Sequence, residues 1–164
     1  MHAMKLAAPG GLDQLHLAEI EPRAPGLGEI QVDIKATSLN FHDYAVVTGL
    51  IPADDGRIPM SDGAGVVTAV GEGVKTFAVG DRVLSYFFPN WAGGRPTLPS
   101  LLGVPGDHID GFAAKTVTMP ASAFSRMPTN LDFDAASTLS CAGLTAWRAL
   151  VVETNLAPGD WVLV

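Results

Sequence analysis

The chain has 164 residues and a formal net charge of −7, and its lysines are spread singly along it. This acidic balance gives no electrostatic site for a nucleic acid or an anionic membrane, and no window approaches the roughly 20 apolar residues that span a bilayer. Its single cysteine, Cys141, excludes an intrachain disulfide and a four-cysteine zinc site, so we expect a cytoplasmic globular protein.

Alternating apolar and polar residues predict several half-buried strands. Residues 15–20 alternate, and residues 29–39 alternate more cleanly, with Ile30, Val32, Ile34 and Ala36 on one face. Three further strands are expected at residues 64–70, 82–88 and 112–119, separated by glycine turns. Short strands with short connections indicate a β-rich fold.

The first helix is expected at residues 41–48, with Asn40 placed to cap its start and Gly49 just past its end. Residues 89–110 show little periodicity and contain four prolines and four glycines. A connection of this length is uncommon unless it has a function, so we expect it beside the active site.

After Pro128 the spacing of apolar residues becomes typical of helices. A helix over residues 134–140 is capped by Asp132, and a second one at residues 143–153 places Leu144, Trp147 and Val151 on one face. Residues 161–164 form a continuous apolar run that is typical of a parallel strand buried on both faces.

Three segments carry a family resemblance. They are residues 38–43 with Gly49, residues 59–67 with 70–74 and 80–83, and residues 140–147 with 158–160. In this order they resemble the medium-chain dehydrogenase/reductase superfamily, in its zinc-free quinone oxidoreductase and alcohol dehydrogenase-like branch. The resemblance implies a mainly β fold with some α: a GroES-like, partly open β-barrel over residues 1–128, connecting helices over 129–157, and over 158–164 the start of a Rossmann domain that is otherwise absent.

The resemblance also implies where a catalytic zinc would lie in metal-dependent relatives. The three ligand positions are occupied here by Asn40, Ser61 and Cys141. An amide and a hydroxyl substitute poorly for thiolate or imidazole, so we expect no metal. Asp62 directly follows Ser61, and it is interpreted either as a turn residue or as a carboxylate close behind the site.

Without a metal, the charge that develops on a substrate oxygen must be met by hydrogen-bond donors or a proton donor. Asn40 and His42 are the catalytic candidates, because an imidazole exchanges protons near neutrality. Asn40, Cys141 and Thr145 are the candidates for contact with NADPH or NADH. Each also has an ordinary structural interpretation: a helix cap for Asn40, a surface histidine for His42, a plain buried thiol for Cys141 and a helical threonine for Thr145.

The resulting hypothesis is a zinc-independent NAD(P)H-dependent oxidoreductase that reduces a quinone, enone or carbonyl compound. The chain would be its N-terminal catalytic part, inactive alone, and the full-length enzyme a homodimer. Two alternatives stay open: a zinc-independent alcohol dehydrogenase, and a stand-alone GroES-like binding module without catalysis.

Asp43 lies in the first turn of the helix predicted at residues 41–48, and its negative charge is expected to complement the helix dipole there.

Overall fold

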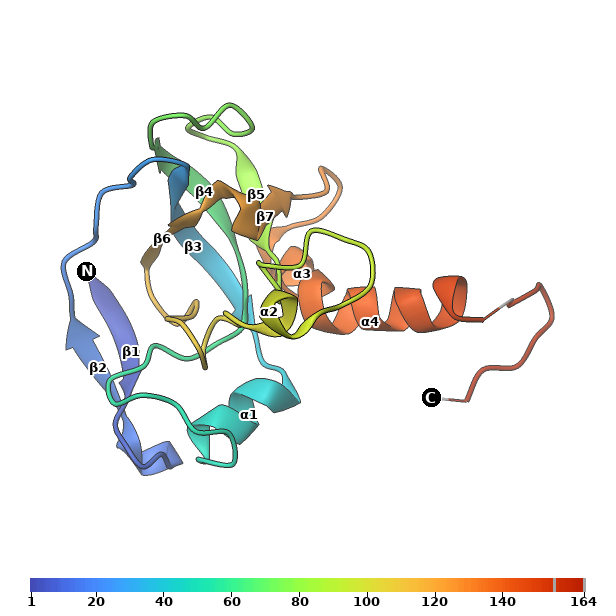
Figure 1. Ribbon diagram of the computed structural model, residues 1–164, viewed down its shortest axis with the longest axis horizontal. Coiled ribbons are helices and arrows are strands. Elements are labelled where there is room, and N and C mark those ends of the chain that lie inside the picture. The colour runs from blue at the N-terminus through green and yellow to red at the C-terminus, as the bar shows by residue number, and fades with distance from the viewer. Residues whose placement is uncertain (155, 164) are drawn as a thin grey trace.

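A computed structural model describes residues 1–154 and 156–163 of the chain. Its main element is a five-stranded antiparallel sheet in the order β6–β3–β4–β5–β7, and a separate two-stranded sheet pairs β1 with β2 (Figure 1). The strands are β1 (His2–Leu6), β2 (Leu15–Glu19), β3 (Glu29–Ser38), β4 (Asp62–Val70), β5 (Arg82–Ser85), β6 (Thr116–Pro120) and β7 (Phe124–Arg126). The edge strands β6 and β7 do not pair with each other, so the barrel is open, as expected.

The long strands β3 and β4 set the register of the main sheet. Ile30 and Val32 of β3 are completely buried, which confirms the predicted alternation. Ile30 lies opposite Val70, and at the other end Ser38 lies opposite Asp62. This antiparallel register brings the end of β3 and the start of β4 together, and the chain immediately after β3 becomes α1.

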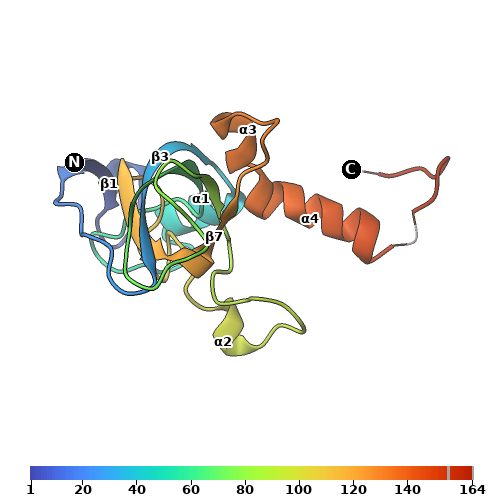
Figure 2. The ribbon, with the colours of Figure 1, turned by 90° about the horizontal axis from the view of Figure 1, so that it is seen from above.

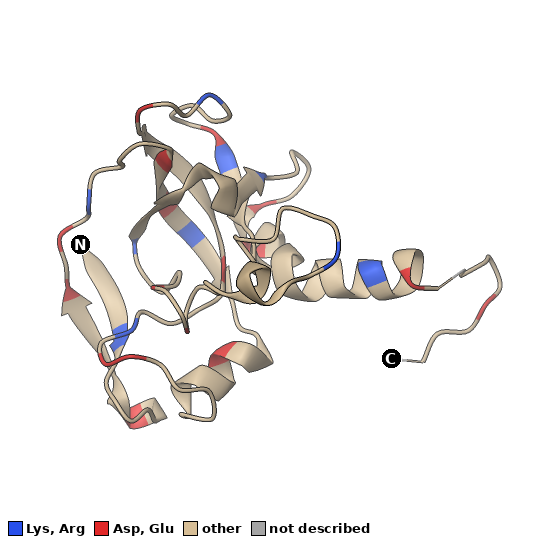
Figure 3. Cartoon of the chain, in the orientation of Figure 1, with Lys and Arg blue, Asp and Glu red and all other residues tan. Residues whose placement is uncertain are grey.

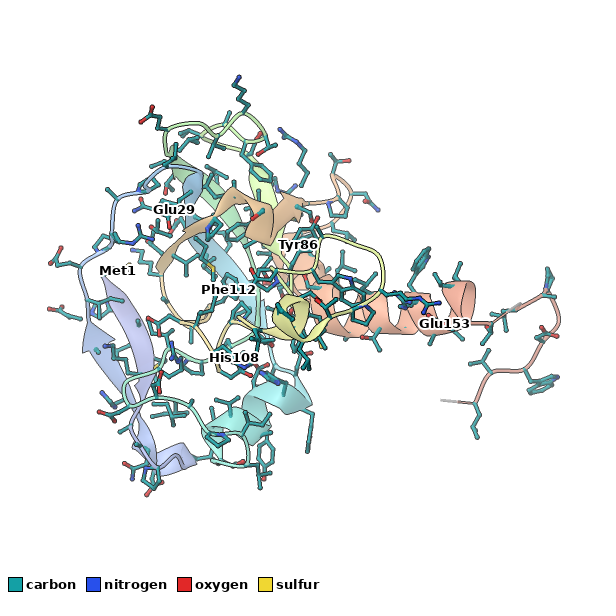
Figure 4. All side chains as sticks on the ribbon, viewed as in Figure 1. Met1, Glu29, Tyr86, His108, Phe112 and Glu153 are labelled. Carbon is teal, nitrogen blue, oxygen red and sulfur yellow. The ribbon has the colours of Figure 1, made fainter. Side chains whose placement is uncertain are left out.

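The core lies against one face of this sheet and includes the aromatic pair Phe112 and Phe124, with ring centroids 6.2 Å apart. Phe112, labelled near the centre of the space between the strands in Figure 4, is 1% exposed. A Cβ on Gly63 would come within 2.6 Å of the Phe112 ring, so only glycine allows β4 to approach it this closely.

Four short α-helices lie within the described residues: α1 (Phe41–Val47), α2 (Leu98–Leu101), α3 (Phe133–Ser137) and α4 (Leu144–Trp147). Two 3-10 turns, Leu12–Gln14 and Ala121–Ala123, precede β2 and β7. Helix α1 agrees with the predicted helix at residues 41–48, and Gly49 follows it with a φ of 80°. At α3, the side chain of Asp132 accepts a hydrogen bond of 2.8 Å from the backbone of Ala135, as its predicted capping role requires.

Wide π-helical turns, Leu139–Gly143 and Arg148–Val152, flank α4. Together the three segments form one helical rod that runs away from the sheets (Figure 2). The predicted face of Leu144, Trp147 and Val151 exists, but these side chains are 54%, 55% and 58% exposed. No helix in the described part of the chain combines the length and the apolar character that crossing a bilayer requires.

Several expected boundaries were wrong. Strand β5 ends at Ser85 rather than at residue 88, and β6 begins at Thr116 rather than at residue 112. The expected strand at residues 161–164 is not formed over residues 161–163, where Trp161 is 99% exposed, and Val164 lies outside the described residues. A parallel strand forms only beside a partner, and the described residues supply none to this segment.

Candidate functional site

Asn40 lies where β3 ends and α1 begins, and its side chain faces the start of β4. Its Nδ2 atom donates to Oδ2 of Asp62 at 2.9 Å and to Oγ of Ser61 at 3.3 Å. A primary amide has two hydrogens, so both are committed to these neighbours. Asn40 is therefore placed to organise the centre, and its side chain also forms a capping box with Asp43 at the start of α1, in line with its predicted capping position.

Asp43, in the first turn of α1, ties the helix to the segment before β4. One carboxylate oxygen accepts from the backbone N–H of Asn40 at 2.7 Å, and the other accepts from the backbone N–H of Ser61 at 2.8 Å. The side chain is buried. The structural interpretation of Asp43 is supported, and its role extends from the helix start to the positioning of Ser61.

Asp62 is completely buried, and burial is the main reason that its pKa is raised above the ordinary value of 3.8. The nearby charge of Asp43 raises its pKa further, whereas hydrogen bonds from Asn40, Ser38 and the backbone of Cys141 oppose the rise. Its Oδ1 atom has no partner among the described residues. Asp62 thus lies directly behind Asn40 and Ser61. This position agrees with its interpretation as a carboxylate close behind the site.

Cys141 reaches the same centre from the first π-helical turn. Burial, followed by the charges of Asp62 and Asp43, raises the pKa of its thiol. A cysteine binds zinc as the thiolate, so an environment that raises the pKa of the Cys141 thiol works against metal binding, as do the amide of Asn40 and the hydroxyl of Ser61. No group of three or more His, Cys, Asp or Glu side chains within the described ranges is arranged to hold a metal. A zinc ion does not fit this donor set.

His42 lies on the first turn of α1 and is largely covered, with 18% of its side chain exposed. Its ring contacts the edge of Phe87, with centroids 5.2 Å apart. Its Nε2 atom is buried and lies 3.3 Å from Oδ2 of Asp107, close enough for an ion pair but not aligned for a hydrogen bond. This histidine is therefore partly buried, with its Nε2 atom inside the fold, and is not the fully exposed surface residue of the ordinary interpretation.

A groove of about 520 Å³ separates the helical rod from the segment after β5. Cys141, Thr145 and Arg148 line it on the rod, and Phe87, Phe88 and Trp91 line it on the opposite side. The rings of Phe87 and Phe88 are 4.8 Å apart, and those of Phe88 and Trp91 are 6.1 Å apart. Of the predicted cofactor residues, Cys141 and Thr145 share one wall, whereas Asn40 is not among the lining residues. His42 is not among them either, but its ring contacts Phe87.

The groove wall is mostly uncharged. Figure 3 shows charged residues over the sheets and loops, with few on the helical rod. Arg148 lies on the rod with its guanidinium carbon 5.9 Å from the Trp91 ring centroid, and it pairs with Glu153. Apolar walls with one cation at the rim are typical of small-molecule pockets.

The sequence did not single out Ser85, Phe87 or Asp107. Ser85 is completely buried; its Oγ accepts from the backbone of Gly63 at 2.9 Å, and its carbonyl accepts from the hydroxyl of Ser140. Phe87 and Asp107 both contact His42. Asp107 lies in the long connection that was expected beside the site, but nothing in the pattern marked one residue within it.

Residues 26–129 match the alcohol dehydrogenase GroES-like domain family. A zinc-type alcohol dehydrogenase-like protein of Schizosaccharomyces pombe is 40% identical over 159 residues, covering 94% of this chain and 46% of that protein. A putative alcohol dehydrogenase from Sinorhizobium meliloti superposes with a TM-score of 0.85 at 36% identity, over 98% of this chain and 49% of that one. Escherichia coli quinone oxidoreductase complexed with NADPH superposes with a TM-score of 0.76 at 25% identity, over 96% and 43%. The chain spans less than half the length of these relatives.

Proposed function

The chain belongs to the medium-chain dehydrogenase/reductase superfamily, with its N-terminal GroES-like domain, and on this basis we propose that it carries the substrate side of a zinc-independent, NAD(P)H-dependent oxidoreductase. The proposed reaction transfers a hydride to a quinone, an enone or another carbonyl compound. The observation that carries the proposal is the hydrogen-bonded centre of Asn40, Ser61 and Asp62. Asn40 and Ser61 stand at two of the three positions that the family resemblance assigns to zinc ligands in metal-dependent relatives.

Reduction adds a hydride and a proton to the substrate, and the proton needs a donor. Both amide hydrogens of Asn40 are committed, and the pKa of the Cys141 thiol is raised. His42 is the remaining candidate, since it lies two residues after Asn40 and its ring contacts Phe87, one of the residues that line the groove. In the proposal, a ring nitrogen of His42 gives its proton to the substrate as the hydride arrives.

The groove suits the flat groups that the reaction would bring together. A bound NADH or NADPH supplies the hydride. Cys141 and Thr145 on the rod would contact its nicotinamide end, and the aromatic wall of Phe87, Phe88 and Trp91 would orient a conjugated substrate and exclude water. A volume of about 520 Å³ is within the range of small-molecule sites.

Substitution of His42 tests this assignment in the complete protein that contains this chain. We expect His42→Ala to lower kcat by about 10²- to 10⁴-fold while cofactor affinity stays within about twofold, because only the proton donor is lost. The exposed His16, changed to alanine, is the matched control and should leave kcat unchanged. Intact cofactor binding together with unchanged turnover and pH profile in His42→Ala would contradict the catalytic role.

A zinc-independent alcohol dehydrogenase is the second candidate. The putative alcohol dehydrogenase superposes more closely than the quinone oxidoreductase, with TM-scores of 0.85 and 0.76. A panel of quinones, enones, aldehydes and alcohols, assayed with both nicotinamide cofactors after metal chelation, separates the two. Loss of all activity on chelation would refute zinc independence, and no turnover with any compound would favour the binding module without catalysis.

A further inference from the structure

A buried carboxylate lies between His42 and a second imidazole. Nε2 of His42 is 3.3 Å from one oxygen of Asp107, and Nδ1 of His108 is 2.5 Å from the other. The side chains are 18%, 6% and 46% exposed in the order His42, Asp107, His108. The carboxylate is therefore the most buried of the three groups, with the largely covered His42 on one side and the half-exposed His108 on the other.

The backbone of its own turn holds the Asp107 carboxylate, because the backbone N–H of His108 donates to Oδ1 of Asp107. Asp107 lies in a turn that closes with a hydrogen bond of 2.8 Å from Gly106 to Ile109 and another of 3.2 Å from His108 to Val104. His108, labelled in Figure 4, marks this turn close to α1. The placement of Asp107 thus depends on the fold of the turn and not on the pairing with His42.

The turn is also joined to the proposed centre. A Cβ on Gly106 would lie 3.0 Å from the backbone nitrogen of Met60, the residue before Ser61. Met60 itself has a φ of 79°, which is rare for a residue other than glycine and marks a locally strained backbone. The segment that places Ser61 and the turn that places Asp107 are therefore packed backbone to backbone.

We propose that Asp107 is a positioning residue for His42, and that His108 competes for the same carboxylate from the solvent side. This rests on the proposed function. Asp107 binds the Nε2–H of His42, which leaves Nδ1 as the nitrogen that exchanges a proton with the substrate. The Nδ1–H bond breaks as the new bond to the substrate forms, and His42 regains a proton from water after the product leaves.

The other ionisable groups around His42 leave Asp107 as its carboxylate partner. Asp43, next to it on α1, uses both oxygens on the backbone of Asn40 and Ser61, and Asp62 on β4 is bonded to Asn40 and Ser38. The segment after β5 contributes the neutral edge of Phe87. A contact of 3.3 Å without full alignment is common for catalytic groups in the absence of substrate and cofactor.

Asp107→Asn in the complete protein is the first test. It keeps the side-chain shape but removes the charge that stabilises the imidazolium, so we expect kcat to fall roughly tenfold or more. The pH above which kcat declines should also move lower, with cofactor affinity unchanged. Asp110→Asn, the same change in the same loop at a residue paired with Arg57, is the control and should keep the wild-type profile.

His108→Gln is the second test, at a more exposed position that is not expected to affect folding. Without the competing imidazole, Asp107 serves His42 alone, so the decline in kcat should move to higher pH, opposite to the shift in Asp107→Asn. Wild-type pH profiles in both variants, or shifts in the same direction, would overturn the proposal. If Asp107→Asn does not fold, the direction of the His108→Gln shift decides.

The proposed function is tested separately, by wild-type oxidation of NAD(P)H with the substrate panel. Activity in the wild type with unchanged profiles in the two variants refutes only the role of Asp107. Absence of wild-type turnover with every cofactor and compound refutes the proposed function and this inference with it.

Discussion

At the residue scale, Asp62 combines the features that distinguish this centre. Asn40 and Ser38 both donate to its Oδ2 atom, while its Oδ1 atom is buried without a partner among the described residues. Burying a carboxylate disfavours its charged form, and here this effect exceeds the combined hydrogen bonds, so the pKa is raised. A group held in this way makes the stability of the chain depend on pH.

The direction in which stability changes with pH follows from the raised pKa of Asp62. The folded chain binds the Asp62 proton more tightly than the unfolded chain, so its stabilising contribution is present at low pH and lost as the pH rises from about 4 through the folded pKa. Asp62→Asn cannot ionise but keeps an acceptor for Asn40. We expect the free energy of unfolding of wild type, measured in urea, to fall relative to Asp62→Asn over this rise. Asp13→Asn, at an exposed position, serves as the control; parallel curves for wild type and Asp62→Asn would contradict the prediction.

At the scale of elements, the pairing of β3 with β4 positions the whole centre. It sets Ser38 opposite Asp62 and leads the chain from β3 directly into Asn40 and α1. The pairing requires close approach at Gly65, where a Cβ would collide with the backbone oxygen of Asp33 and crowd Val32. Gly65 thus has no room for a side chain because of the neighbouring strand.

Gly65→Ala should therefore destabilise the chain by about 2 kcal/mol or more, since the collision is with backbone that cannot rotate away. Thr68→Ala, at an exposed position of the same strand, introduces the same residue and should change stability by less than about 0.5 kcal/mol. Denaturant unfolding measures both. Equal stabilities of the two variants would show that β4 can move away from β3.

At the scale of the whole molecule, the helical rod extends from the sheets with an apolar face that is about half exposed (Figure 2). Leu144, Trp147 and Val151 make this face, and each is more than half exposed. Contiguous exposed apolar surface of this kind commonly marks an interaction site. The same rod carries the inner wall of the groove, so its packing and the proposed site are linked.

We expect the 164-residue chain to self-associate as its concentration rises, because association would cover this face. The double variant Leu144→Gln with Trp147→Gln should weaken the association, as measured by sedimentation. Leu98→Gln removes a single exposed leucine on α2 and should have no effect. A monomeric wild-type chain at every concentration tested would contradict the expectation.

Local patterns were sufficient for much of this organisation. The alternation at Ile30 and Val32 predicted their burial, and Asp132 predicted the start of α3, because strand alternation and helix capping depend on neighbouring residues in the sequence. The ordered motifs indicated the family, which the match over residues 26–129 supports. The strand predicted at residues 161–164 is not formed over residues 161–163. A strand needs a partner strand, and the sequence pattern of the segment does not show whether one is present.

Only the tertiary structure decided what the site residues contact. Asn40, Ser61 and Cys141 could be named from the sequence, but the commitment of both Asn40 hydrogens depends on a register that brings β3 and β4 together. The placement of Asp107 beside His42, 65 positions apart in the chain, likewise depends on packing. The sequence by itself determined which chemical groups are available and which helices and strands carry them. The folded chain decided which groups face each other, because such contacts join residues distant in sequence.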